Sequence, residues 1–343
     1  MINSLLINNA LSWFLSPKSL ILDEEGEWRV KMFGEMIISL YSQVINLNNN
    51  CKSSLVIPYK EIHENHFSVE PKLCIKPILE LQNIVKNESG NLLKHTLIHG
   101  SFADNTYKQG WSDLDTFFVI SNKSLTDLEK LLEMRLLMIK LYHFLEQVDS
   151  LCHHGFIFCT EWDLSNYNSY LMPTEALKHA KSLTQDGSIS FKYDQNVVIS
   201  IKERFLSKLQ LFETFVLSGE FHHHKYNNQY LNIDLKKNPD RMYQLKYFIE
   251  TVMTLPAYYS EAKGDPIYKS DSFYVKDEFQ NNWLIIEKCT KIRELWSQKE
   301  NYPFVGNKIP DWVISILGSN YAQEALNLCK EMQKPFKMDA DYD

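Results

Sequence analysis

Two carboxylates, one residue apart, lie at the start of an apolar run in the 343-residue chain. They are Asp113 and Asp115, preceded by Ser112 and followed by apolar residues as far as Ile120. We expect a strand over 112–120, and residues i and i+2 of a strand point to the same face. Both carboxylates would then lie on one face, roughly 6–7 Å apart along the strand. Like charges this close raise one pKa unless a cation lies between them, and Mg2+ or Mn2+ accepts such oxygen ligands.

The residues upstream supply a complementary phosphate cradle. A short apolar strand is predicted to end at Gly100, and Ser101 follows it. A glycine after a strand lets the backbone approach a ligand closely. Residues 101–105 can begin a short helix, whose free N–H groups bind anions. A cradle of this kind beside an acid pair describes a triphosphate site.

This combination of Gly-Ser, a spacer and Ser-Asp-Leu-Asp resembles the signature of the DNA polymerase β-like nucleotidyltransferase superfamily. It is similar above all to the aminoglycoside-type, small-molecule branch. The resemblance implies that Gly100, Ser101 and Ser112 contact the triphosphate, and that Asp113 and Asp115 are catalytic metal ligands. The implied enzyme moves a nucleoside monophosphate from an NTP, with ATP the expected donor, to a small-molecule acceptor and releases pyrophosphate. The motif covers residues 96–120, and the core up to about residue 160 matches by element order alone.

The third acid of the superfamily site is where the sequence departs from the pattern. The position before the third predicted strand holds His153 or His154, with Asp149 before that strand and Glu161 and Asp163 after it. A histidine could replace the acid as ligand or base, or one of the three acids could reach the site. Alternatively the site lacks a ligand and is inactive. We place His154 first, because imidazole accepts a proton near neutral pH.

Strand alternation gives a specific prediction for His154. If His154, Phe156 and Phe158 share one face, that face begins polar and becomes apolar. The acid pair gives way to Phe117 and Val119 in the same manner. Two neighbouring strands with matching faces would bring His154 to the acid pair.

A polar turn in the C-terminal half offers further phosphate ligands. Lys263 and a Gly-Asp-Pro turn precede Lys269 and Ser272. Helical domains of the superfamily bring a lysine and a serine to the triphosphate from such a place. The resemblance therefore implies Lys269 and Ser272 as ligands, with Lys263 as the alternative lysine that neutralises the leaving pyrophosphate.

The order of elements predicts an α+β fold, in which a small mixed sheet with helices forms the nucleotidyltransferase core. An all-α C-terminal domain follows, because long helical patterns without comparable strand runs fill the rest of the chain. We expect a helical and irregular N-terminal extension over 1–75 that packs on the core, the core over 76–185 and the helical domain over 186–343.

Composition limits the partners. The net charge of -7 argues against a broad nucleic-acid surface, since phosphate neutralisation requires clustered Lys and Arg. Six cysteines without a CxxC pair and no apolar run of ~20 residues indicate a cytoplasmic protein that binds no membrane. The absence of a P-loop argues against a P-loop NTPase or kinase. We expect a monomer or a homodimer. Two alternatives are a catalytically impaired nucleotide-binding sensor or scaffold, and a toxin-like transferase acting on tRNA or protein.

Overall fold

The structure is a computed structural model. It describes residues 4–16, 26–47, 53–67, 75–148, 155–167, 172–193, 197–218, 220–221, 231–232, 242–299 and 309–337. The contacts divide the chain into two compact units. The first comprises residues 1–107 and 112–195, and the second comprises residues 108–111 and 196–343.

A mixed sheet forms the centre of the first unit. Its described strands are β1 (Ser53–Glu61), β2 (Leu93–His99), β3 (Asp115–Ile120), β4 (Ile157–Thr160), β5 (Lys181–Ser182) and β6 (Gly187–Tyr193). The strand order is β4-β3-β2-β5-β1-β6. β3 pairs with β4 and β1 with β5 in parallel, whereas the other neighbours are antiparallel. The predicted α+β class is confirmed.

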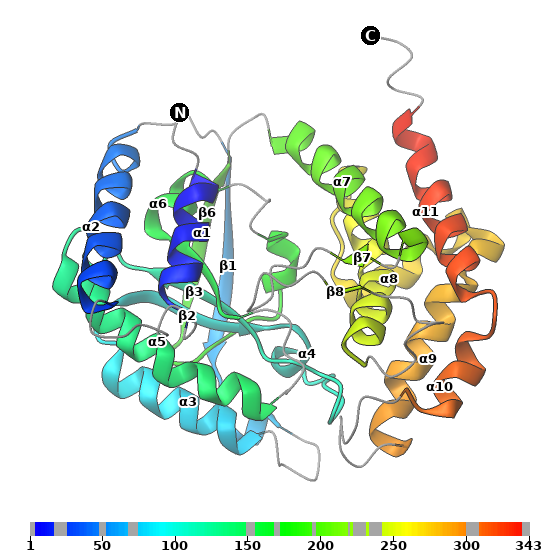
Figure 1. Cartoon of the computed structure of the whole chain (residues 1–343), viewed down its shortest axis with the longest axis horizontal. Helices are drawn as coiled ribbons and strands as arrows, with labels where there is room; N and C mark the ends of the chain where they lie inside the picture. Colours follow the sequence, from blue (N-terminus) through cyan, green and yellow to red (C-terminus); the bar gives the residue numbers. More distant parts are fainter. Residues whose placement is uncertain are drawn as a thin grey trace. The chain divides into compact units, whose positions relative to one another are not determined.

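Helices cover this sheet. They are α1 (Ser4–Phe14), α2 (Gly26–Val44), α3 (Ile75–Glu88), α4 (Gly100–Ala103), α5 (Leu128–Val148) and α6 (Glu161–Ser165), with 3-10 turns η2 (Glu64–His66) and η3 (Thr174–Leu177). α3 and α5 lie side by side, and α1 packs on α2 (Figure 1). Phe118 of β3 stacks on Phe156, which in turn meets Tyr142 of α5. α5 therefore covers the sheet face that carries Phe118.

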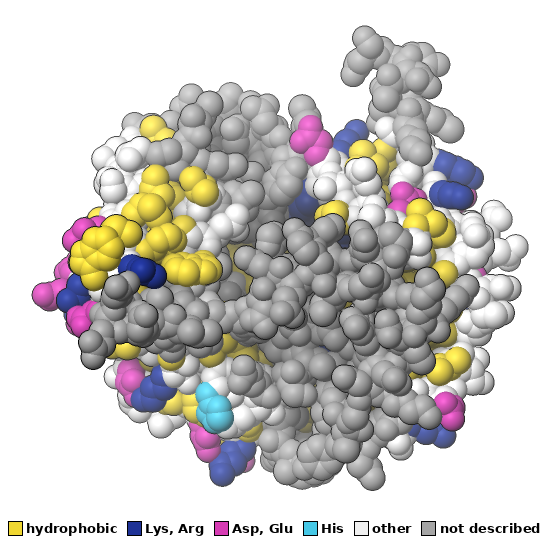
Figure 2. Space-filling model, in the orientation of Figure 1, with side chains coloured by type: hydrophobic (Ala, Val, Ile, Leu, Met, Phe, Trp, Pro, Cys, Tyr) yellow, Lys and Arg dark blue, Asp and Glu magenta, His cyan; other side chains and the backbone are white. Residues whose placement is uncertain are grey.

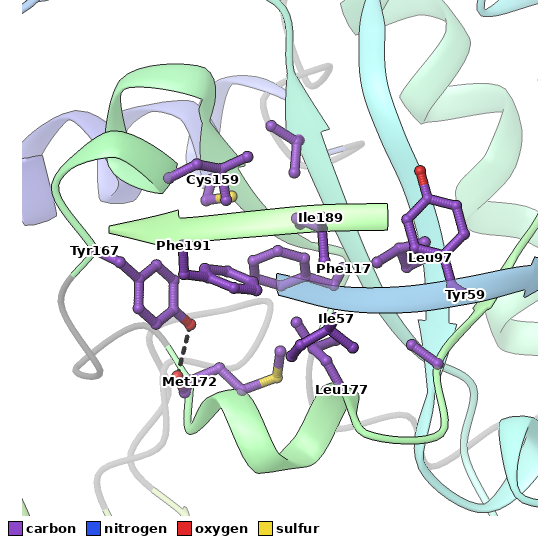
Figure 3. Close-up of a cluster of buried hydrophobic side chains, with 13 residues drawn as sticks. Ile57, Tyr59, Leu97, Phe117, Cys159, Tyr167, Met172, Leu177, Ile189 and Phe191 are labelled. Atoms are coloured by element: carbon purple, nitrogen blue, oxygen red, sulfur yellow. Dashed lines mark hydrogen bonds between the residues drawn. The ribbon is translucent and has the colours of Figure 1, made fainter. Parts of the chain in front are cut away.

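The opposite face carries an apolar cluster that contains Phe117 and Phe191 (Figure 3). The chain that follows β4 covers this face with Tyr167 and Leu177. The Tyr167 hydroxyl donates a hydrogen bond of 2.6 Å to the carbonyl oxygen of Met172, and both residues belong to the cluster (Figure 3). Both faces of β3 are therefore buried, as its continuous apolar run requires.

The sheet extends beyond the limits predicted for the core. β1 lies within the predicted extension, and β6 lies beyond residue 185. The extension over 1–75 is therefore not only helical and irregular, as expected, because β1 runs through Pro58 to Glu61 and pairs with β6 over Ser53–Tyr59. β5 meets β1 only at Lys60 and Glu61, so one side of β1 has no described strand partner at Pro58. A residue without an N–H is tolerated in such a place.

The second unit is built mainly from helices. They are α7 (Val197–Ser218), α8 (Met242–Ala262), α9 (Leu284–Lys299), α10 (Asp311–Leu317) and α11 (Tyr321–Lys337), with 3-10 segments η4 (Lys269–Glu278) and η5 (Gln280–Trp283). Between α8 and α9 the chain forms 3-10 turns and becomes α-helical again only at Leu284. β7 (Glu220–Phe221) and β8 (Leu231–Asn232) form a minimal pair, so this unit is helical but not strictly all-α.

Apolar side chains also lie on the surface of α1 and α2. They include Trp13, Trp28 and Met32, which are 52%, 67% and 49% exposed. Figure 2 shows apolar side chains gathered on the left, over the region in which Figure 1 draws these helices. Among the described residues, no helix is both long and apolar enough to cross a membrane.

Candidate functional site

The two parts of the predicted motif, the Gly-Ser turn and the acid pair, meet where β2 ends and β3 begins. β2 ends at His99, and β3 begins at Asp115, its partner in the antiparallel register. The end of one strand lies beside the start of the next in such a pair. Gly100 therefore follows β2 at the point where Asp115 opens β3.

Gly100 lies directly against the Asp115 carboxylate. Its φ is +66°, in the left-handed region that favours glycine. A Cβ at this position would lie 2.1 Å from Asp115 Oδ2 and 3.0 Å from Asp115 Cγ. No side chain fits here without moving the carboxylate, so Gly100 gives the backbone its close approach to Asp115.

The turn after Gly100 is held by its own hydrogen bonds. α4 is a single turn, and the Asp104 N–H donates to the carbonyl oxygen of Gly100 at 3.1 Å. The Thr106 N–H donates to the Ser101 carbonyl oxygen at 2.9 Å and to Asp104 Oδ1 at 3.0 Å. The Phe102 ring stacks on Tyr107, with centroids 4.8 Å apart. These contacts fix the Gly-Ser turn beside Asp115.

The strand is shorter than predicted, and this changes the geometry of the acid pair. β3 begins at Asp115, whereas we expected it to begin at Ser112. β2 ends opposite Asp115, so the β2–β3 register does not extend to residues 112–114. The i, i+2 rule therefore does not place Asp113. Ser101, Ser112 and Asp113 are nevertheless buried, at 4%, 6% and 8% exposure.

The strand register contradicts the assumption behind the His154 prediction. Phe117 and Val119 pair with Ile157 and Cys159 in the parallel β3–β4 ladder, so these residues share the face of Asp115. Phe156 and Phe158 contact Phe118 instead. Their face is therefore opposite to that of Asp115. The assumption failed because the sequence does not reveal the register between two strands.

The two described acids after β4 have structural roles. Glu161 accepts a hydrogen bond of 2.9 Å from the Asn122 N–H. Asp163 forms a capping box with Thr160 at the start of α6 and also accepts from the Asn8 amide at 3.2 Å. Burial raises the pKa of the Asp163 carboxyl. These bonds give both acids a role in joining α6 and α1 to the sheet.

Asp149, His153 and His154 lie outside the described residues. Within the described part of the chain, no group of three or more His, Cys, Asp or Glu side chains is arranged to hold a metal ion. Asp113 and Asp115 are thus the described acids of the candidate site. The third group remains a prediction.

The predicted phosphate ligands of the second unit lie in η4 and at its entrance. Lys269 is exposed, and the buried Ser272 hydroxyl donates to the Lys269 carbonyl oxygen at 2.6 Å. Lys263 instead pairs with Glu278 at 2.7 Å and lies over the Tyr259 ring. Lys269 is therefore the more available of the two lysines for a ligand.

The sequence did not predict that part of the motif region belongs to the helical unit. Residues 108–111, between the Gly-Ser turn and the acid pair, belong to the second unit. Trp111 is 1% exposed and packs on Trp296. The available signal was a tryptophan in an otherwise polar loop, because such a large apolar side chain is usually buried.

Comparison of the chain with protein-family models, curated proteins and solved structures gives no match. The functional interpretation therefore depends on the motif and on its geometry.

Proposed function

We propose that the protein is a metal-dependent nucleotidyltransferase, which moves a nucleoside monophosphate from an NTP, with ATP as the expected donor, to an acceptor. The contact between Gly100 and the Asp115 carboxylate carries this proposal. It joins the two halves of the motif, which are 15 positions apart in the chain, at one edge of the sheet. The resemblance and the local geometry therefore point to the same residues.

The residues of the proposed site have the chemistry that the reaction needs. Asp113 and Asp115 are hard oxygen donors, which suit Mg2+ or Mn2+. The missing Cβ at Gly100 gives the Asp115 carboxylate the space that it occupies against the backbone of the Gly-Ser turn. A bound divalent ion would supply charge neutralisation for the phosphate oxygens. Asp113 and Asp115 would hold that ion, and the Gly-Ser turn would orient the triphosphate.

The proposed transfer forms one bond and breaks one. An acceptor oxygen attacks the α-phosphorus of the NTP, and the bond from that phosphorus to the bridging α–β oxygen breaks. Pyrophosphate leaves with the electron pair of that bond, and the acceptor proton passes to a base or to solvent. Positioning and charge neutralisation supply most of the rate in such reactions, which agrees with a site built from a rigid turn and two acids.

Calorimetry with ATP, with and without Mg2+, tests the binding step. Asp113→Asn combined with Asp115→Asn should abolish Mg2+-dependent binding while the circular dichroism spectrum stays unchanged. Glu35→Gln combined with Glu129→Gln removes the same charge at exposed positions of α2 and α5 and should bind as the wild type does. Unchanged binding in the double Asp variant would remove the metal assignment.

A second candidate function is nucleotide binding without transfer, as a sensor or scaffold. One observation favours it: the face of β4 shared with Asp115 carries Ile157 and Cys159 rather than an acid, while Glu161 and Asp163 are held in structural bonds. A sensor returns ATP intact after long incubation with candidate acceptors, whereas a transferase releases pyrophosphate. The acceptor, and the cytoplasmic location expected from the sequence, remain predictions.

A further inference from the structure

A histidine from an earlier part of the first unit contacts the Gly-Ser turn. His66, the last residue of η2, has its Nε2 atom 3.1 Å from the carbonyl oxygen of Phe102. Phe102 is the third residue of α4 and directly follows Ser101. A carbonyl oxygen only accepts, so the imidazole donates and carries a proton on Nε2. The turn at the proposed site is therefore bonded to a side chain 36 positions earlier in the chain.

The His66 ring is neutral at pH 7. Burial lowers the pKa of His66 below its usual value, and the nearby charge of Lys181 lowers it as well. The carbonyl groups of Phe102 and Ala103 and the charge of Asp104 act in the opposite direction, but the net shift is downward. A neutral imidazole has a single N–H. The bond to Phe102 therefore uses the only proton that the ring carries.

The segment that carries His66 is itself fixed to the sheet and to α3. The Ile62 N–H donates to the Ser182 carbonyl oxygen of β5 at 2.8 Å, and the Ile62 carbonyl oxygen accepts from the Gln82 amide of α3 at 2.8 Å. Ile62 is buried. The His66 N–H then donates to the His63 carbonyl oxygen at 2.9 Å, which closes η2. His66 thus approaches the turn from an ordered backbone within the same unit.

Aromatic side chains join the same two segments. Phe67 meets His66 edge to face at 5.3 Å between ring centroids, and it meets Tyr107 at 6.4 Å. Tyr107 stacks on Phe102, and all three apolar rings are buried. This packing brings η2 and the turn together. The hydrogen bond adds direction, because it requires the Phe102 carbonyl to point at the imidazole.

We propose that His66 is a positioning residue for the Gly-Ser turn, because it fixes the direction of the Phe102 carbonyl before the triphosphate binds. The peptide group is planar, so the bond also sets the orientation of the peptide that joins Phe102 to Ala103. A turn that is ordered in advance binds its ligand more tightly, since less conformational freedom is lost on binding. The inference rests on the proposed function, since it assigns a source of order to the proposed phosphate-binding turn.

The test changes the donor at position 66 in three ways. His66→Leu removes the donor and keeps a side chain of similar size. His66→Gln places an amide N–H near the position of Nε2, whereas His66→Asn places it near Nδ1, too far from the Phe102 carbonyl. His63→Leu is the matched control, because His63 is 65% exposed and its side chain makes no cap bond to η2.

Full-length variants are compared by calorimetry with ATP and Mg2+. We expect His66→Leu and His66→Asn to bind ATP about tenfold more weakly than the wild type, the effect of one lost buried hydrogen bond. His66→Gln and His63→Leu should remain within about threefold of the wild type. A loss of stability alone would not produce this difference between Gln and Asn. Should His66→Leu fail to fold, His66→Asn takes its place in the comparison with His66→Gln.

Two measurements do not depend on ATP. Hydrogen exchange of the Asp104 and Thr106 N–H groups, which close the turn, should be faster in His66→Leu and His66→Asn but not in His66→Gln. Residues 93–99, in β2, should stay protected in all variants. Nitrogen NMR of the wild type at pH 8, where the ring is neutral, should show the His66 proton on Nε2.

The inference is overturned if folded His66→Leu binds ATP as the wild type does, or if His66→Gln binds no better than His66→Asn. A His66 ring that carries its proton on Nδ1 would also overturn it. Absence of ATP binding by the wild type would instead refute the proposed function. Exchange at Asp104 and Thr106 then decides whether His66 orders the turn: faster exchange in His66→Leu that His66→Gln restores supports it, and any other pattern refutes it.

Discussion

Replacement of Gly100 by alanine is the sharpest test of the site geometry. The new Cβ would lie 2.1 Å from Asp115 Oδ2. The carboxylate must move by about 1 Å to restore an ordinary contact, and a misplacement of that size can cost a site about 100-fold. The left-handed φ of +66° adds a backbone penalty of about 1–2 kcal/mol. We therefore expect Gly100→Ala to lose about 100-fold in Mg2+-dependent ATP affinity and to be less stable.

Gly90→Ala is a matched control for the backbone term. Gly90 also has a left-handed φ, of +44°, but a Cβ there would meet nothing within 4 Å. Urea unfolding of Gly90→Ala should give the backbone penalty alone, with ATP affinity unchanged. The excess loss in Gly100→Ala then measures the clash with Asp115.

A double-mutant cycle identifies the partner in that clash. Asp115→Ala removes Oδ2 and Cγ, so only Asp115 Cβ, at 3.3 Å, would remain near the new methyl group. In this background Gly100→Ala should cost no more stability than Gly90→Ala does. The reasoning is refuted if Gly100→Ala matches Gly90→Ala in both stability and affinity in the wild-type background.

Three further predictions concern other residues. Asp163→Ala should lower the free energy of unfolding by roughly 1–3 kcal/mol, because it leaves the buried donors of the capping box unpaired; urea unfolding measures this, and a loss of ATP affinity at unchanged stability would contradict the structural role. Burial lowers the pKa of His95 to about 4 from 6.5, so the unfolded chain binds the proton first and stability falls as pH drops below 6.5. Unfolding at pH 7 and pH 5 should show a loss of about 1–2 kcal/mol that His95→Gln removes, and an equal slope in both proteins would disprove the assignment. Lys269→Ala should weaken ATP binding by roughly 1–3 kcal/mol. Lys263→Ala should have little effect, since Lys263 already pairs with Glu278. If calorimetry gives the wild-type ATP affinity for both variants, Lys269 is a surface residue without a role in binding.

Local patterns were sufficient for much of the fold. The long helical patterns expected in the C-terminal domain appear as α7, α8, α9 and α11, because helix hydrogen bonds join residues close in sequence. The strands β2 and β3 were also predictable, since both are apolar runs bounded by turn residues.

Pairing between distant segments was not predictable in the same way. β1 contains Pro58 and finds its partner, β6, far along the chain. The face of β4 that meets Asp115 depends on the β3–β4 register, and a shift of one residue would exchange Ile157 for Phe156 or Phe158. Tertiary packing chooses that register, because it decides which face is buried.

The candidate site also has one part that the sequence predicts and one part that depends on tertiary contacts. The sequence by itself determined that Gly100, Ser101, Asp113 and Asp115 belong together, because residue type and spacing carry that chemistry. Only the tertiary structure decided that Gly100 touches the Asp115 carboxylate, and that Asp113 lies before the strand, beyond Trp111. Those facts depend on where β2 ends against β3 and on which core buries the loop. Both are settled by contacts between residues far apart in the chain, which spacing alone does not encode.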